Sequence, residues 1–126
     1  MTSRPWIRVA TLLAALALSG GVAAQDFPNK PIRVVVPYPP GGQSDIFTRL
    51  IADAMQKSLN VPVNVENRAG AGTTLGAAVV AKSPPDGYTL LLAAASATAI
   101  TPLTIKSAAF DPRTITPITL SAKVPY

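Results

Sequence analysis

The chain has 126 residues, 48% of them hydrophobic, with 11 basic and 6 acidic side chains, 13 prolines, 8 glycines, no histidine and no cysteine. A chain of this length holds one small domain at most. The absence of His and Cys excludes Ser-His-Asp and Cys-His catalysis, a disulfide framework and the usual zinc sites, so the composition favours a binding protein that needs no metal or cofactor.

Residues 1–24 have the three parts of a secretory signal peptide. Two arginines precede an apolar stretch over residues 9–18, and small residues follow, with Val22 and Ala24 suited to cleavage before Gln25. The apolar stretch is about half of the roughly 20 residues that a membrane-spanning helix needs. A buried or amphipathic N-terminal helix is the alternative, but it would need interleaved charges. We therefore expect export to the periplasm and no stable membrane insertion after cleavage.

Residues 25–126 keep nine basic and six acidic side chains, and the basic residues are scattered singly along the chain. Nucleic-acid grooves need clustered basic residues with interleaved aromatic rings. This pattern therefore predicts a solvated surface and no nucleic-acid partner.

Strand and helix patterns alternate from residue 32 onward. The β-branched run 32–36 predicts a strand buried on both faces. Apolar residues at three- and four-residue spacing then predict a helix from Ser44, its N-cap, to Asn60, with a buried face made of Ile46, Phe47, Leu50, Ile51, Ala54 and Met55. A second strand over 61–66, a second helix from Thr73 or Thr74 to Lys82 and a fully buried third strand over 88–93 follow. Residues 98–105 are compatible with a short helix or turn, and 117–122 with a fourth strand.

This order is a βαβαβ unit, which implies a parallel sheet with right-handed crossovers. Ligands of such sheets bind beyond the carboxyl ends of the strands, where loops enter helices. Two glycine-bearing loops fall at that edge, over residues 37–44 and 67–76, and residues 94–96 follow the third strand there. Free N–H groups at the start of a helix can hold a carboxylate without a cationic side chain. The alternative is that these glycines only turn the chain.

The segment Gly70–Gly76 superficially matches a dinucleotide-binding fingerprint but fails in detail. That fingerprint wants a small residue where Leu75 stands, follows the first strand of its unit, and needs an acidic residue at the end of the next strand. Here Asp86 precedes the third strand instead. Asp45 and Asp53, eight residues apart on one helix, are not a close acid/base pair either, so an α/β enzyme is disfavoured.

Four ordered motifs resemble the Bug/TctC family, the periplasmic solute-binding receptors of tripartite tricarboxylate transporters. They are KPIRVVVPYPPGGQSD over 30–45, VENRAGAG over 65–72 with Gly76, PDGYTLL over 85–91, and FDP over 110–112. The resemblance implies an α/β fold, part of the first lobe of a type II periplasmic binding protein, with a mostly parallel sheet and flanking helices. It also implies a small carboxylate as ligand and membrane permease subunits as partners.

Carried over residue by residue, the resemblance implies a ligand site in three segments, in which backbone amides, hydroxyls and ordered water hold a carboxylate. Thr98 is a further candidate beside Ser96, and Arg68 is expected to pair with a nearby acid or carbonyl. The predicted ligand-binding residues are Tyr38, Pro39, Gly41, Gly42, Ser44, Asp45, Asn67, Ala71, Gly72, Thr73, Thr74 and Ser96.

Members of this family are much longer, so the expected organisation is a signal peptide over 1–24 and an incomplete N-terminal lobe over 25–126. Three interpretations follow. The first is a truncated carboxylate receptor. The second is a non-functional remnant whose unpaired sheet edges impair folding. The third, a small α/β enzyme, is disfavoured by the missing His, Cys and cofactor motifs.

Overall fold

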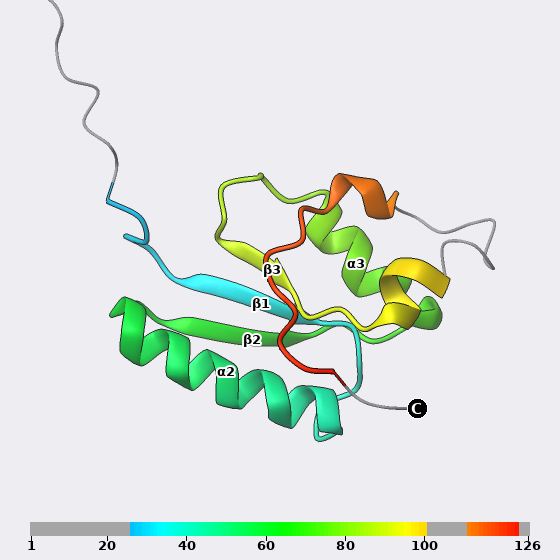
Figure 1. Ribbon diagram of the computed structural model, residues 1–126, viewed down its shortest axis with the longest axis horizontal. Helices are drawn as coiled ribbons and strands as arrows, with labels where there is room; N and C mark the ends of the chain where they lie inside the picture. The colour runs from blue at the N-terminus through cyan, green and yellow to red at the C-terminus, as the bar shows by residue number, and fades with distance from the viewer. Residues whose placement is uncertain (1–25, 101–110, 124–126) are drawn as a thin grey trace, which may run out of the picture.

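The centre of the fold is a three-stranded parallel sheet in the order β2-β1-β3 (Figure 1). The computed structural model describes residues 26–100 and 111–123. Strands β1 (Ile32–Val36), β2 (Val63–Asn67) and β3 (Thr89–Leu91) pair in parallel, with Val34 opposite both Val65 and Leu90. This confirms the predicted α/β class and parallel sheet. The expected signal peptide lies outside the described residues.

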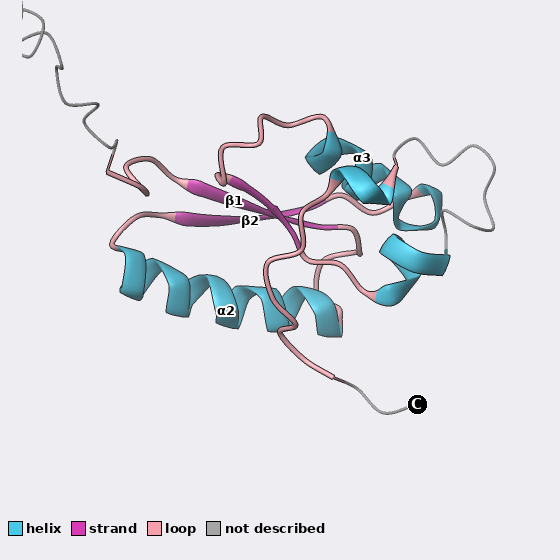
Figure 2. Cartoon of the chain, turned by 45° about the horizontal axis from the view of Figure 1, so that its top comes forward, coloured by secondary structure: helices cyan, strands magenta, loops and turns pink. Residues whose placement is uncertain are grey.

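Two helices connect the strands and cover opposite faces of the sheet (Figure 2). Helix α2 (Gln43–Leu59) joins β1 to β2, and α3 (Thr74–Ala81) joins β2 to β3. Under α2, Ile32, Val34, Ala52 and Val63 form the main buried cluster. On the other face, Ala77 and Ala78 of α3 pack with Leu91. Small side chains on α3 let that helix approach the sheet closely, because packed interiors leave few voids.

Helix α2 is rotated relative to the apolar face expected from its sequence. The buried side chains are Asp45, Thr48 and Ala52, whereas Ile46 and Leu50 are 56% and 65% exposed. The prediction that Ile46, Leu50 and Ala54 are buried is therefore wrong. The polar contacts of Asp45 with the loop before α2 and with the end of β2 fix the rotation, and apolar spacing alone does not contain this constraint.

The helix also begins differently from the prediction at its N-terminus. Gly42 is the N-cap and has no side-chain cap, so the assignment of this role to Ser44 is wrong. The Asp45 carboxylate accepts the Gly41 N–H instead, at 2.8 Å, which satisfies a donor at the turn that enters α2. The predicted end is confirmed, because Asn60 is the C-cap with a left-handed backbone (φ 54°).

Two further expectations need correction. Strand β3 spans only three residues, and all three are half-buried, whereas we expected a fully buried strand over 88–93. Residues 117–122 contain no strand, and Ile118 and Leu120 are 77% and 79% exposed. A strand needs a hydrogen-bonded neighbour, and within the part of the chain that the structure describes none lies beside this segment.

At the edge of the sheet where the strands begin, the residues before β1 contact the turn before β3. The Tyr88 hydroxyl donates to Asn29 Oδ1 at 3.0 Å and accepts from the Asn29 N–H at 2.9 Å. Lys30 pairs with Asp86 at 3.0 Å and lies 4.2 Å from the centre of the Tyr88 ring. These contacts hold the start of the sheet together. None of the helices in the described ranges has the length and apolar character needed to cross a membrane.

Candidate functional site

All the predicted site residues lie at the carboxyl edge of the sheet, where the three parallel strands end. Tyr38, Pro39, Gly41 and Gly42 form the loop between β1 and α2, here called the first loop, and Ser44 and Asp45 belong to the first turn of α2. Asn67 ends β2. The second loop runs from Arg68 to Thr73, and its last three residues form the 3-10 turn η1 (Ala71–Thr73), immediately before Thr74. Ser96 begins the π-helical turn η2 (Ser96–Ile100), and its side chain is outside the described part.

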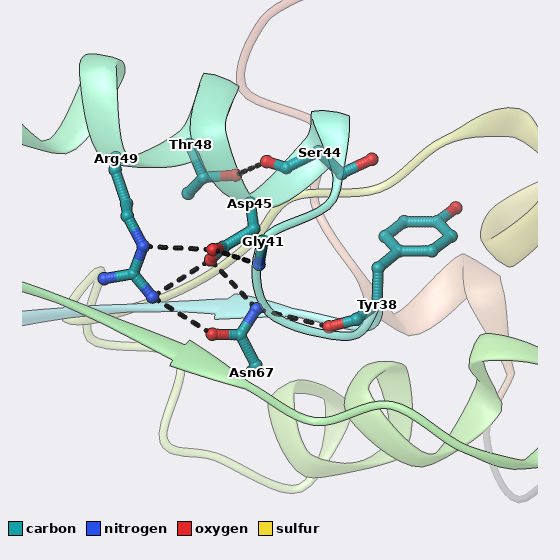
Figure 3. Close-up of polar contacts among 7 residues, drawn as sticks. All are labelled: Tyr38, Gly41, Ser44, Asp45, Thr48, Arg49 and Asn67. Atoms are coloured by element: carbon teal, nitrogen blue, oxygen red, sulfur yellow. Dashed lines mark hydrogen bonds and ion pairs between the residues drawn. The ribbon is translucent and has the colours of Figure 1, made fainter.

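A polar cluster of Asp45, Arg49 and Asn67 joins the first loop to the end of β2 (Figure 3). The buried Asp45 carboxylate accepts from the Gly41 N–H at 2.8 Å, from Arg49 Nε at 3.1 Å and from Asn67 Nδ2 at 3.0 Å. Asn67 Nδ2 also donates to the Tyr38 carbonyl at 3.2 Å, and its Oδ1 accepts from Arg49 at 3.2 Å. The first loop is therefore held at two points of its backbone.

These contacts favour the ionised form of Asp45. Hydrogen bonds from the Arg49 guanidinium, from the Gly41 N–H and from the Asn67 amide, in that order of size, lower the pKa of Asp45 from 3.8 to about 2. Desolvation of the buried carboxylate opposes this shift and is outweighed. Asp45 is consequently an anion at neutral pH and is not suited to donate a proton.

The second loop has a backbone that few side chains tolerate. Ala71, Gly72 and Thr73 have φ values of 48°, 61° and 77°, all in the left-handed region. Left-handed residues other than glycine cost on the order of 1–3 kcal/mol each and gather at ligand-binding loops. Thr74 Oγ1 donates to the Ala71 carbonyl at 2.7 Å. Thr73 Oγ1 is buried without a hydrogen-bond partner among the described residues.

The two loops meet where α3 begins. Arg68 N donates to the carbonyl of Val36, the last residue of β1, at 2.8 Å, which extends the pairing of β1 and β2 into the second loop. Gly76, in the first turn of α3, lies so close to the first loop that a Cβ added there would come within 2.9 Å of Pro37 Cβ and 3.1 Å of the Arg68 carbonyl oxygen. The second loop also lies against η2 through η1. The structure thus brings all three predicted segments to one edge.

Sequence reasoning missed Arg49, which is not among the predicted site residues. Its position four residues after Asp45 was the available signal, because residues at this spacing are neighbours on a helix. Arg68 pairs with Glu66, as expected. The described residues contain no group of three or more His, Cys, Asp or Glu side chains that could hold a metal ion.

Exposed glycines border the edge, and the carboxylate of Asp45 is fixed there by internal hydrogen bonds. Together with the parallel sheet and its two covering helices, this is the α/β fold of the periplasmic binding proteins, which solved structures share.

The sequence profile described as "Tripartite tricarboxylate transporter family receptor" matches residues 47–126. The chain therefore belongs to this receptor family. It is 45% identical over 89 residues to protein BugT from Bordetella pertussis. The matched segment covers 71% of this chain and 27% of BugT.

Two solved structures with bound solutes resemble the chain. One is MatC from Rhodopseudomonas palustris with bound malate, at 38% identity and a TM-score of 0.64, covering 68% of this chain and 29% of MatC. The other is a protein of R. palustris with adipate, at 32% identity and a TM-score of 0.67, covering 70% of this chain and 29% of that protein. The chain thus spans less than a third of the length of these relatives.

Proposed function

We propose that this chain forms part of a periplasmic receptor that binds a small carboxylate and delivers it to the membrane permease subunits of a tripartite transporter. Export through a signal peptide over residues 1–24 belongs to the same proposal. The observation that carries it is the similarity to two solved proteins that hold malate and adipate, both of them dicarboxylates.

The proposed solute site lies between the first and second loops. One carboxylate of the solute accepts hydrogen bonds from the backbone N–H groups of Gly42 and Ala71, and from the Thr73 hydroxyl. Thr73 supports this assignment because its buried oxygen has no partner within residues 26–100 and 111–123. An unsatisfied buried polar group costs about 1–3 kcal/mol unless a ligand or water restores the bond. The left-handed backbone of η1 gives a second line of support, since strained loops gather at ligand sites.

The test is isothermal titration calorimetry of the chain with malate, adipate and citrate, after circular dichroism has established that it is folded. We expect one of these to bind. A hydrogen bond to a charged group contributes about 1.5–3 kcal/mol, so Thr73→Ala should weaken that binding by roughly ten- to a hundredfold. Thr73→Ser is the matched control, because it keeps the hydroxyl and should retain the affinity.

Two results would count against the proposal. If the folded chain gives no heat with any of the three acids, carboxylate binding by this chain is wrong. If Thr73→Ala and the unsubstituted chain bind equally well, the solute is not held by the second loop. Delivery to a permease is tested separately, by uptake of the bound acid in cells with and without the receptor gene.

A further inference from the structure

The proposed solute site already contains a fixed negative charge. The Asp45 side chain is only 5% exposed, and one of its oxygens lies 2.8 Å from the backbone nitrogen of Gly41, in the same loop that we propose for the solute. Two carboxylates close together repel each other, and the repulsion grows as water is excluded. A receptor for anions with an uncompensated carboxylate at this position would oppose its own ligand.

Arg49 compensates this charge from the other side of the carboxylate. Its Nε lies 3.1 Å from Asp45 Oδ2 and its terminal nitrogen 3.0 Å from Oδ1, the two-point geometry in which a guanidinium matches a carboxylate. Figure 3 shows Arg49 on one side of Asp45, and Tyr38 on the other, with its ring turned away from the cluster. The guanidinium is therefore placed to cancel the charge of Asp45, and its Nε contacts the same oxygen, Oδ2, that accepts the Gly41 N–H.

Asn67 fixes both partners in this arrangement. Its amide nitrogen donates to Asp45 at 3.0 Å and its oxygen accepts from Arg49 at 3.2 Å. Because Asn67 ends β2, the position of the ion pair is set by the sheet. Arg49 itself is 52% exposed, whereas Asp45 is 5% exposed, so the guanidinium faces solvent while the carboxylate that it pairs with is buried.

We infer that Arg49 is a positioning residue of the solute site: it neutralises Asp45 and so allows the loop that Asp45 organises to accept an anionic solute, without contacting the solute. This inference rests on the proposed carboxylate-binding function. It implies that the affinity for carboxylates depends on the charge at position 49 only while a charge is present at position 45.

The test compares malate binding by Arg49→Lys, Arg49→Gln and the double variant Asp45→Asn/Arg49→Gln, each checked for folding by circular dichroism. Arg49→Gln should bind malate about three- to tenfold more weakly in 10 mM salt, the effect of one uncompensated charge near a solvated anion site. This loss should shrink at 150 mM salt, where the screening length falls to about 8 Å. Arg49→Lys keeps the charge and should bind nearly as well as the unsubstituted chain, and the double variant should recover most of the lost affinity.

A purely structural role predicts different results. In that case Arg49→Lys loses as much affinity as Arg49→Gln, because lysine cannot form the two-point contact. The double variant then binds no better than Arg49→Gln. Either result overturns the inference while leaving carboxylate binding by the unsubstituted chain in place. If the unsubstituted chain binds none of malate, adipate and citrate, the proposed function fails, and the role of Arg49 fails with it. If it binds adipate or citrate but not malate, the same variants are compared with that acid, and the same outcomes apply.

Discussion

Replacing Gly76 by alanine tests whether the two loops are packed as tightly as the structure indicates. Gly76 is the third residue of α3, and a Cβ there would lie 2.9 Å from Pro37 Cβ, 3.1 Å from Pro37 Cα and 3.1 Å from the Arg68 carbonyl oxygen. A rigid proline ring and backbone atoms, rather than the flexible end of a side chain, would have to move. Overpacking of this kind costs about 1–3 kcal/mol.

Two effects determine the net change in the free energy of unfolding of Gly76→Ala. Alanine is a better helix former than glycine by about 1 kcal/mol in a helix interior, and by less in the first turn. The steric cost therefore outweighs this gain, and we expect Gly76→Ala to lower the free energy of unfolding by about 1–2 kcal/mol. For a domain of this size each kcal/mol lowers Tm by about 4–8 °C.

Gly42→Ala is the matched control. A Cβ at Gly42 would approach the Pro39 carbonyl oxygen at 3.6 Å, an ordinary contact, and its φ of −78° suits any residue. The free energy of unfolding of Gly42→Ala should differ from that of the unsubstituted chain by less than about 0.5 kcal/mol. Alanine is a weaker N-cap, which destabilises the helix, but it makes the unfolded chain less flexible, which stabilises the folded state. Urea unfolding followed by circular dichroism gives both values. Equal stability of the two variants would refute the close approach of α3 to the first loop.

Two further predictions concern stability. Because the pKa of Asp45 is lowered from 3.8 to about 2, its carboxylate stabilises the folded chain above pH 3.8, and this contribution is lost as the pH falls from 3.8 through 2. Asp45→Asn should therefore reduce the loss of unfolding free energy over this pH range. An identical loss in the variant and the unsubstituted chain would contradict the lowered pKa of Asp45. Tyr88→Phe removes the two hydrogen bonds to Asn29 but keeps the ring contacts, so urea unfolding should show a loss of about 1 kcal/mol, whereas no loss would mean that these bonds exchange freely with water.

The sheet was predictable because its signals are local. The run from Ile32 to Val36 is apolar except for Arg33, which in a short segment bounded by prolines favours a buried parallel strand. The order of strand and helix then implies that the loops carrying Gly41 and Gly72 share one edge. Both inferences depend on residues that are neighbours in sequence, and the structure confirms both.

The rotation of α2 was not predictable, because it depends on a contact across 22 residues. The spacing of Ile46 and Leu50 favours a buried apolar face, whereas the hydrogen bond between Asp45 and Asn67 turns a polar side chain toward the sheet. Sequence periodicity measures where apolar residues fall, not which polar residue has a partner. Arg49 was missed for a different reason: its partner Asp45 is only four residues away, but a lone arginine on a helix is usually solvated.

The strand order has a consequence for the way the chain folds during synthesis. Strand β1 is made first but occupies the centre of the sheet, and its partners follow later: Ile32 pairs with Val63, and Arg33 with Thr89. At about 5–20 residues per second, the ribosome needs roughly 1–5 s to extend from the first of these partners to the second. During this time the most apolar strand has no completed sheet around it. The nascent chain therefore exposes its most apolar strand early, and a chaperone that binds residues 32–36 would protect this strand from aggregation until β3 has been synthesised.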